Sequence, residues 1–240
     1  MDTDIVAYNW EDFTAWFKEV WAPGHHMAFI GPTGTGKSTA MVGILPLRKY
    51  VIAIDPKGGD DTLKALLQHG FIESDWPPKR QVWKDIEDGK PARLVLGSRV
   101  NARSELPKLR NQIAKCLGDV WDQRNWTVYI DELQIATDRR LMGLGAYVER
   151  NLIAARTRGI SFVGSFQQPV WVPPSMAKMS RWFATFYTRD IDTVNRIAEM
   201  AGRPKEEIRG MVKGLPEYCF LLFSNNPRHP VIVTQPPKAN

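Results

Sequence analysis

Short apolar runs recur along the chain and alternate with stretches that have the apolar spacing of helices. The runs predict buried strands, because they are short, continuous and rich in β-branched or aromatic residues. They are HMAFI (26–30), YVIAI (50–54), ARLVL (92–96), WTVYI (126–130), ISFVGSF (160–166) and WFATFY (182–187). The helical patterns span 61–69, 107–124, about 143–158, 190–201 and 204–213. This alternation predicts an α/β fold with a central, mostly parallel sheet flanked by helices on both faces.

Both ends of the chain carry further elements. Asn9, followed by Glu11 and Asp12, is typical of a helix start, and Pro23-Gly24 would stop that helix. Its apolar positions predict an amphipathic helix that packs on the core or on a neighbouring subunit. The segment 218–234 predicts a C-terminal β-hairpin. We expect one domain over 1–240, with the N-terminal helix in 1–25 and the core in 26–235.

The composition is that of a folded protein, with 43% hydrophobic and 24% charged residues among 240. No apolar run approaches the roughly 20 residues that span a bilayer, and the first residues, MDTDIVAYNW, are unlike a signal peptide. The two cysteines, Cys116 and Cys219, form no metal-binding or disulfide pattern. A reducing cytoplasm is therefore the expected location.

Positive charge is concentrated in two segments. Residues 93–124 contain seven Lys or Arg and three Asp or Glu, and residues 139–158 contain five Arg and one Glu, so each has a net charge of +4. Residues 51–92 have a net charge of −2, from six basic and eight acidic residues. Basic segments that converge on one face can bind phosphates. Solvated helix surfaces would give the same counts.

A glycine-rich loop follows the first predicted strand and opens a helix. It has the spacing G-x-x-x-x-G-K-S, from Gly31 to Ser38. The backbone N–H groups of such a loop surround phosphates, the lysine reaches the β and γ oxygens, and the serine is a ligand of Mg²⁺. A glycine turn before a helix would not require Lys-Ser at this spacing. The sequence therefore predicts a site for ATP and Mg²⁺, and its residues are Gly31, Pro32, Thr33, Gly34, Thr35, Gly36, Lys37, Ser38 and Thr39.

The strand WTVYI delivers two carboxylates, Asp131 and Glu132, at its end. Asp131 has the position of a Walker B aspartate, which holds Mg²⁺ through water, and Glu132 is placed to act as general base on the attacking water. A helix cap is the alternative for an Asp-Glu pair in this position. No His, Cys or Asp cluster has metal-ligand spacing, so Mg²⁺ with the nucleotide is the only metal we expect.

The order of these motifs predicts the type of P-loop NTPase. A further strand separates YVIAIDPKGGDD from the Asp-Glu strand along the chain, so we expect at least one strand between the P-loop strand and the Asp-Glu strand. This indicates the RecA-like, additional-strand, catalytic-Glu type, and favours hydrolysis coupled to mechanical work. We further expect the strand that ends at Asp55 to lie beside the P-loop strand, with Asp55 supporting the site or facing a subunit. Trp21, His25 and His26 precede the P-loop strand, where a packed helix–strand junction is a simpler interpretation than contact with the base.

Four segments follow one another along the chain: GPTGTGKST (31–39), IDPKGGD (54–60), VYIDELQ (128–134) and RTRGISFVGSFQQP (156–169). In this order they resemble the HerA/FtsK superfamily of DNA-translocating ATPases. The closing segment GLPEYCFLLFSNNPRHPVIV (214–233) resembles the final hairpin of the family. The resemblance implies a catalytic role for Gln167 as a sensor of the γ-phosphate, and for Arg156 or Arg158 as a finger that reaches the neighbouring subunit. A strand-end cap for Gln167 and solvated helix ends for the arginines are the alternatives.

The chain departs from the family pattern at two places. Ser161 stands where the family often has His, and Phe166-Gln167-Gln168 replaces Thr-Gln-Arg, so Gln168 is a second candidate for the sensor. The resemblance also implies a homo-oligomeric ring, a hexamer, around double-stranded DNA that it contacts through the backbone without reading sequence. Candidate contacts, chosen from charge and predicted topology, are Arg99, Arg103, Lys108, Arg110, Arg139 and Arg140.

The expected function is an ATP-driven DNA translocase. The chain begins about 30 residues before the P-loop and ends soon after the predicted hairpin. This most resembles the genome-packaging ATPases of internal-membrane icosahedral viruses, which implies a capsid or membrane docking partner and a place in the host cytoplasm or at a virion vertex. A plasmid or mobile-element translocase and a nucleotide-dependent assembly switch remain alternatives.

Overall fold

One mixed sheet organises the part of the chain that the computed structural model describes, which is residues 5–59, 61–100, 102–226 and 228–237. The strand order is β1-β10-β9-β8-β2-β7-β6-β3-β5-β4. The strands are β1 (Ile5–Ala7), β2 (His26–Ile30), β3 (Tyr50–Ile54), β4 (Ile72–Glu73), β5 (Ala92–Leu96), β6 (Thr127–Ile130), β7 (Ser161–Phe166), β8 (Ser180–Phe186), β9 (Phe220–Ser224) and β10 (Val231–Thr234). All six predicted strands are present, and β8 through β4 pair in parallel.

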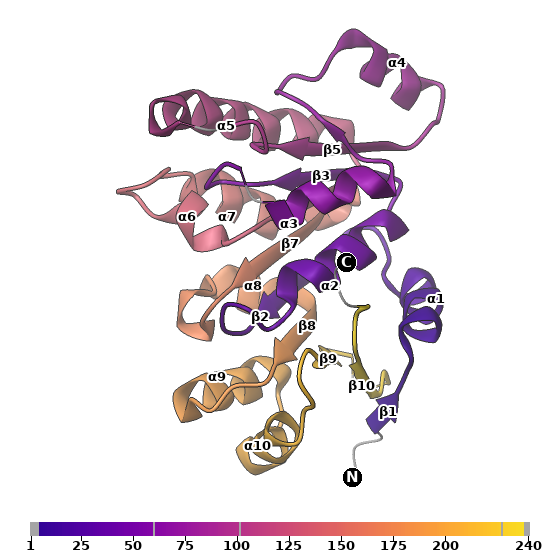
Figure 1. The fold of residues 1–240 in the computed structure, drawn as a ribbon, viewed down its shortest axis with the longest axis vertical. Coiled ribbons are helices and arrows are strands. Elements are labelled where there is room, and N and C mark those ends of the chain that lie inside the picture. The colour runs from indigo at the N-terminus through magenta and orange to yellow at the C-terminus, as the bar shows by residue number, and fades with distance from the viewer. Residues whose placement is uncertain (1–4, 60, 101, 227, 238–240) are drawn as a thin grey trace.

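Helices cover both faces of this sheet, as predicted (Figure 1). Alternate residues of each strand point to opposite faces: in β2, Met27 and Phe29 pack with α1 and α2, whereas Ala28 and Ile30 pack with the other layer. The helices are α1 (Trp10–Val20), α2 (Lys37–Ile44), α3 (Asp61–Lys64), α4 (Arg80–Glu87), α5 (Leu106–Gln123), α6 (Leu133–Thr137), α7 (Gly145–Ala154), α8 (Pro174–Met179), α9 (Ile191–Ala201) and α10 (Lys205–Lys213). Short 3-10 turns lie at Leu45–Leu47, Ala65–His69, Arg103–Glu105, Ala155–Arg158 and Pro169–Trp171.

The N-terminal helix forms where its sequence predicts it. The Asn9 side chain caps α1 by accepting a 2.8 Å hydrogen bond from the backbone N–H of Asp12. Phe13, Phe17 and Trp21 are buried against the sheet, so the apolar face of the helix belongs to the core of this same chain. None of the described helices combines the length and apolar character that crossing a membrane requires.

The predicted C-terminal hairpin forms from β9 and β10, which pair antiparallel. It extends the main sheet, because β9 also pairs antiparallel with β8. The three-residue strand β1 then adds to the outer side of β10 with Ile5 opposite Val231. This pairing joins the start of the described chain to its last strand, and the short β1 was not predicted.

The order of the central strands confirms one prediction and corrects another. A strand does lie between the P-loop strand β2 and the Asp-Glu strand β6, but it is β7, which follows both along the chain. The prediction that the strand ending at Asp55 lies beside β2 is wrong. Both β7 and β6 separate β3 from β2, because the later strand β7 takes the place that chain order favours for β3.

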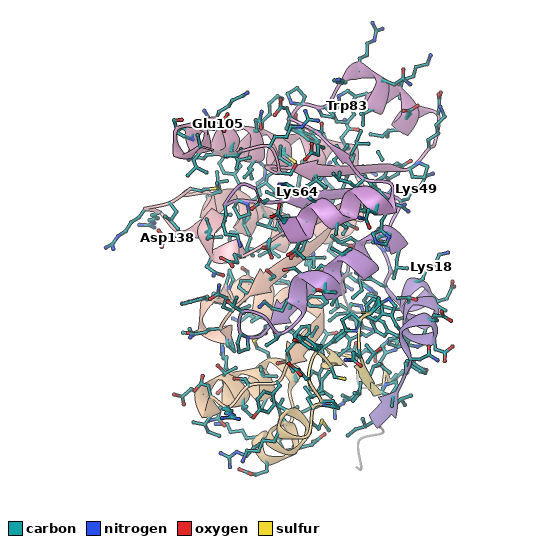
Figure 2. All side chains as sticks on the ribbon, in the orientation of Figure 1. Lys18, Lys49, Lys64, Trp83, Glu105 and Asp138 are labelled. Carbon is teal, nitrogen blue, oxygen red and sulfur yellow. The ribbon has the colours of Figure 1, made fainter. Side chains whose placement is uncertain are left out.

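The parallel strands give the sheet two distinct edges. Figure 2 shows Lys49, which precedes β3, on one side of the molecule, and Glu105 and Asp138, which follow β5 and β6, on the other. The carboxyl ends of the central strands all reach the second edge. In open α/β sheets ligands bind at the carboxyl ends of the strands, so this edge is the place to look for a site.

Candidate active site

The phosphate loop connects β2 to α2. Gly34 and Gly36 have φ values of +80° and +98°, in the left-handed region that glycine adopts without strain. The loop therefore turns sharply enough to aim the first N–H groups of α2 at one point. The Lys37 ammonium folds back and donates hydrogen bonds to the carbonyl oxygens of Gly31 (2.7 Å) and Pro32 (2.8 Å). Thr35 donates to the same Pro32 oxygen at 2.8 Å.

Lys37 is buried, with 8% of its surface exposed. Burial lowers the pKa of its ammonium, and the charges of Asp131 and Glu132 act in the opposite direction. A cation in a partly desolvated position interacts strongly with an anion that enters beside it. The loop is therefore prepared to receive a phosphate.

A cavity of about 540 Å³ opens in front of this loop. That volume lies in the range of small-molecule and cofactor sites. Its wall is formed by Thr33, Gly34, Gly36, Lys37, Ser38, Thr39, Lys57, Thr62, Asp131, Glu132, Ser165, Tyr218, Pro236 and Pro237. Six of the nine predicted loop residues line the cavity. The other three do not line it: Gly31 and Pro32 accept hydrogen bonds from Lys37, and Thr35 donates to Pro32.

Asp131 is fixed by two hydroxyl groups. Tyr129 and Ser165 both donate hydrogen bonds of 2.7 Å to Oδ1. The other oxygen, Oδ2, lies 3.6 Å from the ammonium of Lys57. Asp131 and Ser38 line the same cavity and offer the hard oxygen ligands that Mg²⁺ prefers. The lysine beside Oδ2 shows that this position accommodates positive charge, so the residues fit the metal.

Glu132 holds its carboxylate over the cavity through an unusual backbone. Its φ of 43° and ψ of 60° are left-handed, which costs a non-glycine residue about 1–2 kcal/mol. The backbone N–H donates to Ser165 Oγ at 2.9 Å, which compensates for part of that cost. Strain of this kind concentrates at functional sites, where the surrounding structure imposes it. The helix-cap alternative for this Asp-Glu pair is not supported, since neither carboxylate makes a capping hydrogen bond to α6.

Two side chains hold the carboxylate of Glu132. The amide of Gln167 donates to Oε1 at 3.1 Å, and the Lys57 ammonium lies 3.2 Å from the same oxygen. Gln168 instead accepts a backbone hydrogen bond from Trp171 and its side chain is exposed. Of the two candidate sensors, the structure therefore brings Gln167 to the Asp-Glu pair.

Three residues of this site carry roles that sequence reasoning did not assign. Ser165 donates to Asp131 and accepts from the backbone of Glu132, so one hydroxyl fixes both carboxylate residues. Tyr129 precedes Asp131 by two positions and shares its face of the strand. Lys57 reaches the pair because Asp55, which is fully buried, accepts from the backbone N–H groups of Lys57 and Gly58 at 3.0 Å each and so fixes the turn.

Comparison with known proteins agrees with the fold. No protein-family model and no curated protein matches the chain. Among solved structures, the DNA-packaging ATPase B204 of Sulfolobus turreted icosahedral virus superposes with a TM-score of 0.60 at 21% identity, over 90% of this chain and 100% of that one. VirB4 of Thermoanaerobacter pseudethanolicus superposes with a TM-score of 0.61 at 10% identity, over 89% of each chain. The chain has the fold of the HerA/FtsK-type P-loop ATPases.

A third match adds a conjugation protein with the same P-loop ATPase fold. The pCW3 conjugation coupling protein TcpA, solved with ATPγS, superposes with a TM-score of 0.50 at 12% identity, over 88% of this chain and 60% of that one. The B204 protein of Sulfolobus turreted icosahedral virus 2 was likewise solved with ATPγS, and it matches with a TM-score of 0.60 at 18% identity. The shared fold thus occurs in proteins that hold a triphosphate analogue.

The two candidate finger arginines do not reach this cavity. Both precede β7 and lie at the edge of the sheet opposite the P-loop, separated from Gln167 by the length of the strand, roughly 20 Å. Arg158 donates to the carbonyl oxygen of Trp121 at 3.0 Å and stacks on its ring at 4.6 Å. Arg156 is exposed. Burial of Arg181 is the main cause that lowers the pKa of that residue, and the charge of Arg156 lowers it further. Of the two, Arg156 is the one with its side chain in solvent.

The helix–strand junction before β2 also lies at this opposite edge. His26 is buried and accepts a 2.9 Å hydrogen bond from the backbone N–H of Phe162 at Nδ1. Its Nε2 lies 3.1 Å from the carbonyl oxygen of Leu152, so the neutral ring donates there. Ser161 accepts from the backbone N–H of Gly24. Trp21, His25 and His26 are therefore parts of a packed junction, far from the P-loop.

Part of each basic segment lies on the P-loop side of the molecule. Arg110 of α5 donates a 2.6 Å hydrogen bond to the carbonyl oxygen of Met142, which joins α5 to the loop that carries Arg139 and Arg140. Figure 2 shows Glu105 and Asp138, neighbours of these two groups, on the same side. Lys108, Arg139 and Arg140 are exposed, while Arg99 pairs with Glu73 at 3.0 Å. The side chain of Arg103 lies outside the described part of the structure.

Proposed function

We propose that this chain is a Mg²⁺-dependent ATPase that couples ATP hydrolysis to the translocation of double-stranded DNA, as the genome-packaging motor of a virus. One observation supports the proposal above others: Lys37, Asp131 and Glu132 line one cavity, and Gln167 donates to Glu132, in a fold shared with packaging ATPase B204 over 90% of the chain. These are the residue types that bind a triphosphate, hold its metal and activate water.

In this proposal each side chain has its own step. Lys37 exchanges its loop carbonyl partners for phosphate oxygens when the nucleotide enters. Ser38 and Asp131 would hold Mg²⁺, which supplies charge neutralisation at the phosphates. Glu132 accepts the proton of the attacking water. Gln167, which now donates to Glu132, can instead donate to a phosphate or to that water, and so links the carboxylate to the state of the nucleotide.

A motor of this class further requires a track and an assembly. The exposed cations Lys108, Arg139 and Arg140 would contact the phosphate backbone without reading sequence. Arg156, exposed at the opposite edge, would reach the nucleotide of the next subunit in a homo-oligomeric ring, which we propose to be a hexamer. The ring would dock on a capsid or membrane partner, in the host cytoplasm or at a virion vertex.

A second candidate is a plasmid or mobile-element translocase. It is favoured by the fold matches to VirB4 and to the conjugation coupling protein TcpA. Both candidates are DNA motors and differ in the docking partner. A nucleotide-dependent assembly switch would use the same cavity without a DNA track.

The rate of ATP hydrolysis with and without duplex DNA tests the proposal. We expect DNA to increase the turnover of the wild-type protein and expect Lys37→Ala to abolish turnover under both conditions. Hydrolysis that DNA leaves unchanged in the assembled protein would favour the switch. Co-purification with a capsid protein or with a conjugation partner then distinguishes the two motors.

A further inference from the structure

The cavity continues past the phosphate loop to a group of residues unlike the rest of its wall. On the β6 side of the P-loop strand stand Asp131 and Glu132. On the β9–β10 side stand Tyr218, Pro236 and Pro237, and we call this side the outer end of the cavity. An aromatic ring and two prolines offer flat, apolar surface and no charge. Such a surface does not suit a phosphate, and it lies within the same cavity as the loop that binds phosphates.

The fold explains why these residues meet at this edge. Because β9 and β10 are antiparallel, the start of β9 and the end of β10 lie at the same edge as the P-loop. The register pairs Thr234 with Phe220, so extending it by two residues places Pro236 opposite Tyr218. Gln235 fixes this extension, since its side-chain amide donates a 3.2 Å hydrogen bond to the carbonyl oxygen of Glu217.

Tyr218 is held in place although its ring is exposed. Its φ is +62°, a left-handed conformation that a tyrosine rarely adopts, and 42% of its surface is accessible. A hydrogen bond with Glu217 raises the pKa of the Tyr218 hydroxyl above its ordinary value. A side-chain atom built at Gly36 would lie 3.7 Å from Cδ1 of the ring, so the ring stands beside the first turn of α2. A strained, exposed aromatic beside a phosphate loop is a surface for stacking.

We propose that the base of the bound nucleotide stacks on Tyr218 and is enclosed by Pro236 and Pro237. The inference rests on the proposed function, since it needs a nucleoside triphosphate in the cavity. With the phosphates on the loop and Lys37, the outer end of the same cavity is the place left for the base. Stacking on an aromatic ring contributes roughly 1–3 kcal/mol per base, measured by alanine substitution.

Affinity for two probes separates the base site from the phosphate site. ATPγS carries both base and phosphates, whereas inorganic tripolyphosphate carries only the phosphates. For Tyr218→Ala we expect about tenfold or greater loss of ATPγS affinity in calorimetry, with tripolyphosphate affinity unchanged. Tyr218→Phe keeps the ring and should bind both probes like the wild type. The matched control is Tyr147→Ala, which removes an exposed tyrosine from α7, away from the cavity.

The outcomes distinguish this inference from the proposed function. Equal ATPγS affinity in Tyr218→Ala, Tyr147→Ala and wild type would overturn the base site and leave the proposed ATPase standing. A wild-type protein that binds neither probe would overturn both. The base site and the proposed function would both be supported if Lys37→Ala lost affinity for both probes while Tyr218→Ala lost affinity for ATPγS only.

A direct map of the base gives an independent readout. Photolabelling with 2-azido-ATP places the reactive group on the base, and trypsin releases peptides 214–228 and 229–238 from this region. We expect the label in these two peptides, and expect excess ATP to prevent it. Label that excess ATP prevents but that falls wholly outside both peptides would overturn the assignment of the base to this end of the cavity.

Discussion

The ammonium of Lys57 lies 3.2 Å from Oε1 of Glu132 and 3.6 Å from Oδ2 of Asp131, although the lysine and this pair come from turns more than seventy residues apart. One cation thus neutralises part of the charge of two neighbouring carboxylates. It also adds positive charge to a cavity that must receive a triphosphate.

We therefore predict that Lys57→Met weakens ATP binding by roughly tenfold, because it leaves two carboxylates facing the phosphates with less compensation. Lys57→Arg keeps the charge and should stay within a few-fold of the wild type. Equilibrium binding of ATPγS measures both. Unchanged affinity in Lys57→Met would show that the lysine acts only on the carboxylates.

Replacing the proposed base, Glu132→Gln, should preserve nucleotide binding and reduce turnover by several orders of magnitude. The amide retains the shape of the side chain but cannot accept the proton of the water. Single-turnover hydrolysis and ATPγS binding, measured side by side, check the two parts. Loss of binding together with turnover would point to a structural role for this strained residue.

The two arginines before β7 should give different defects. Arg158→Ala removes a hydrogen bond and a ring contact within the chain, and should lower the free energy of unfolding by about 1–2 kcal/mol. Arg156→Ala alters an exposed side chain and should leave stability within about 0.5 kcal/mol. In the assembled protein it should reduce turnover by roughly a thousandfold.

Urea unfolding and concentration-dependent ATPase assays measure these effects. A monomeric preparation that hydrolyses ATP at the assembled rate would contradict a finger acting between subunits. So would an Arg156→Ala protein with full turnover in the assembled state.

Neutralising the basic loop should weaken DNA binding. We expect Arg139→Ala with Arg140→Ala to reduce the salt dependence of duplex binding by roughly one unit of slope for each phosphate that the protein no longer neutralises. The matched control is Lys18→Ala with Lys84→Ala, which removes the same charge from two exposed positions on α1 and α4. Binding isotherms over a range of salt concentrations measure this slope. Equal slopes in the two double variants would show that this loop does not contact DNA.

Stability should fall as the pH is lowered from about 7 to 4. Burial lowers the pKa of His26 to about 4, and the unfolded chain has the ordinary value of 6.5. Between these values the unfolded state binds more protons, so acid favours unfolding, by up to about 3 kcal/mol from this residue. Partial burial lowers the pKa of His25 in the same direction. Unfolding midpoints across this range and an NMR titration of the ring test this, and titration of His26 near 6.5 would contradict it.

Sequence patterns predicted the local elements well and their long-range arrangement less completely. The phosphate loop is continuous in sequence, and the strands have local apolar signals, so the residue order alone was enough to locate both. The place of β7 between β2 and β6 depends on which strands fit together across the sheet, and no local pattern encodes that. Lys57 lies beside Glu132 because of the geometry of the turn after Asp55. Pro236 lies opposite Tyr218 because of the register of the hairpin. The three residues of β1 are too few to give a periodic signal.

The position of β7 limits how this chain can move. Val163 lies opposite Met27 on one side and Tyr129 on the other, so the strand is bonded along both flanks. It cannot slide alone, because a one-residue slip would turn every side chain to the other face. The distance between Gln167 and the arginines at the far end of the strand is therefore fixed by covalent and hydrogen-bonded geometry. A displacement of Gln167 would therefore carry the far end of β7 and the paired strands β2 and β6 along with it.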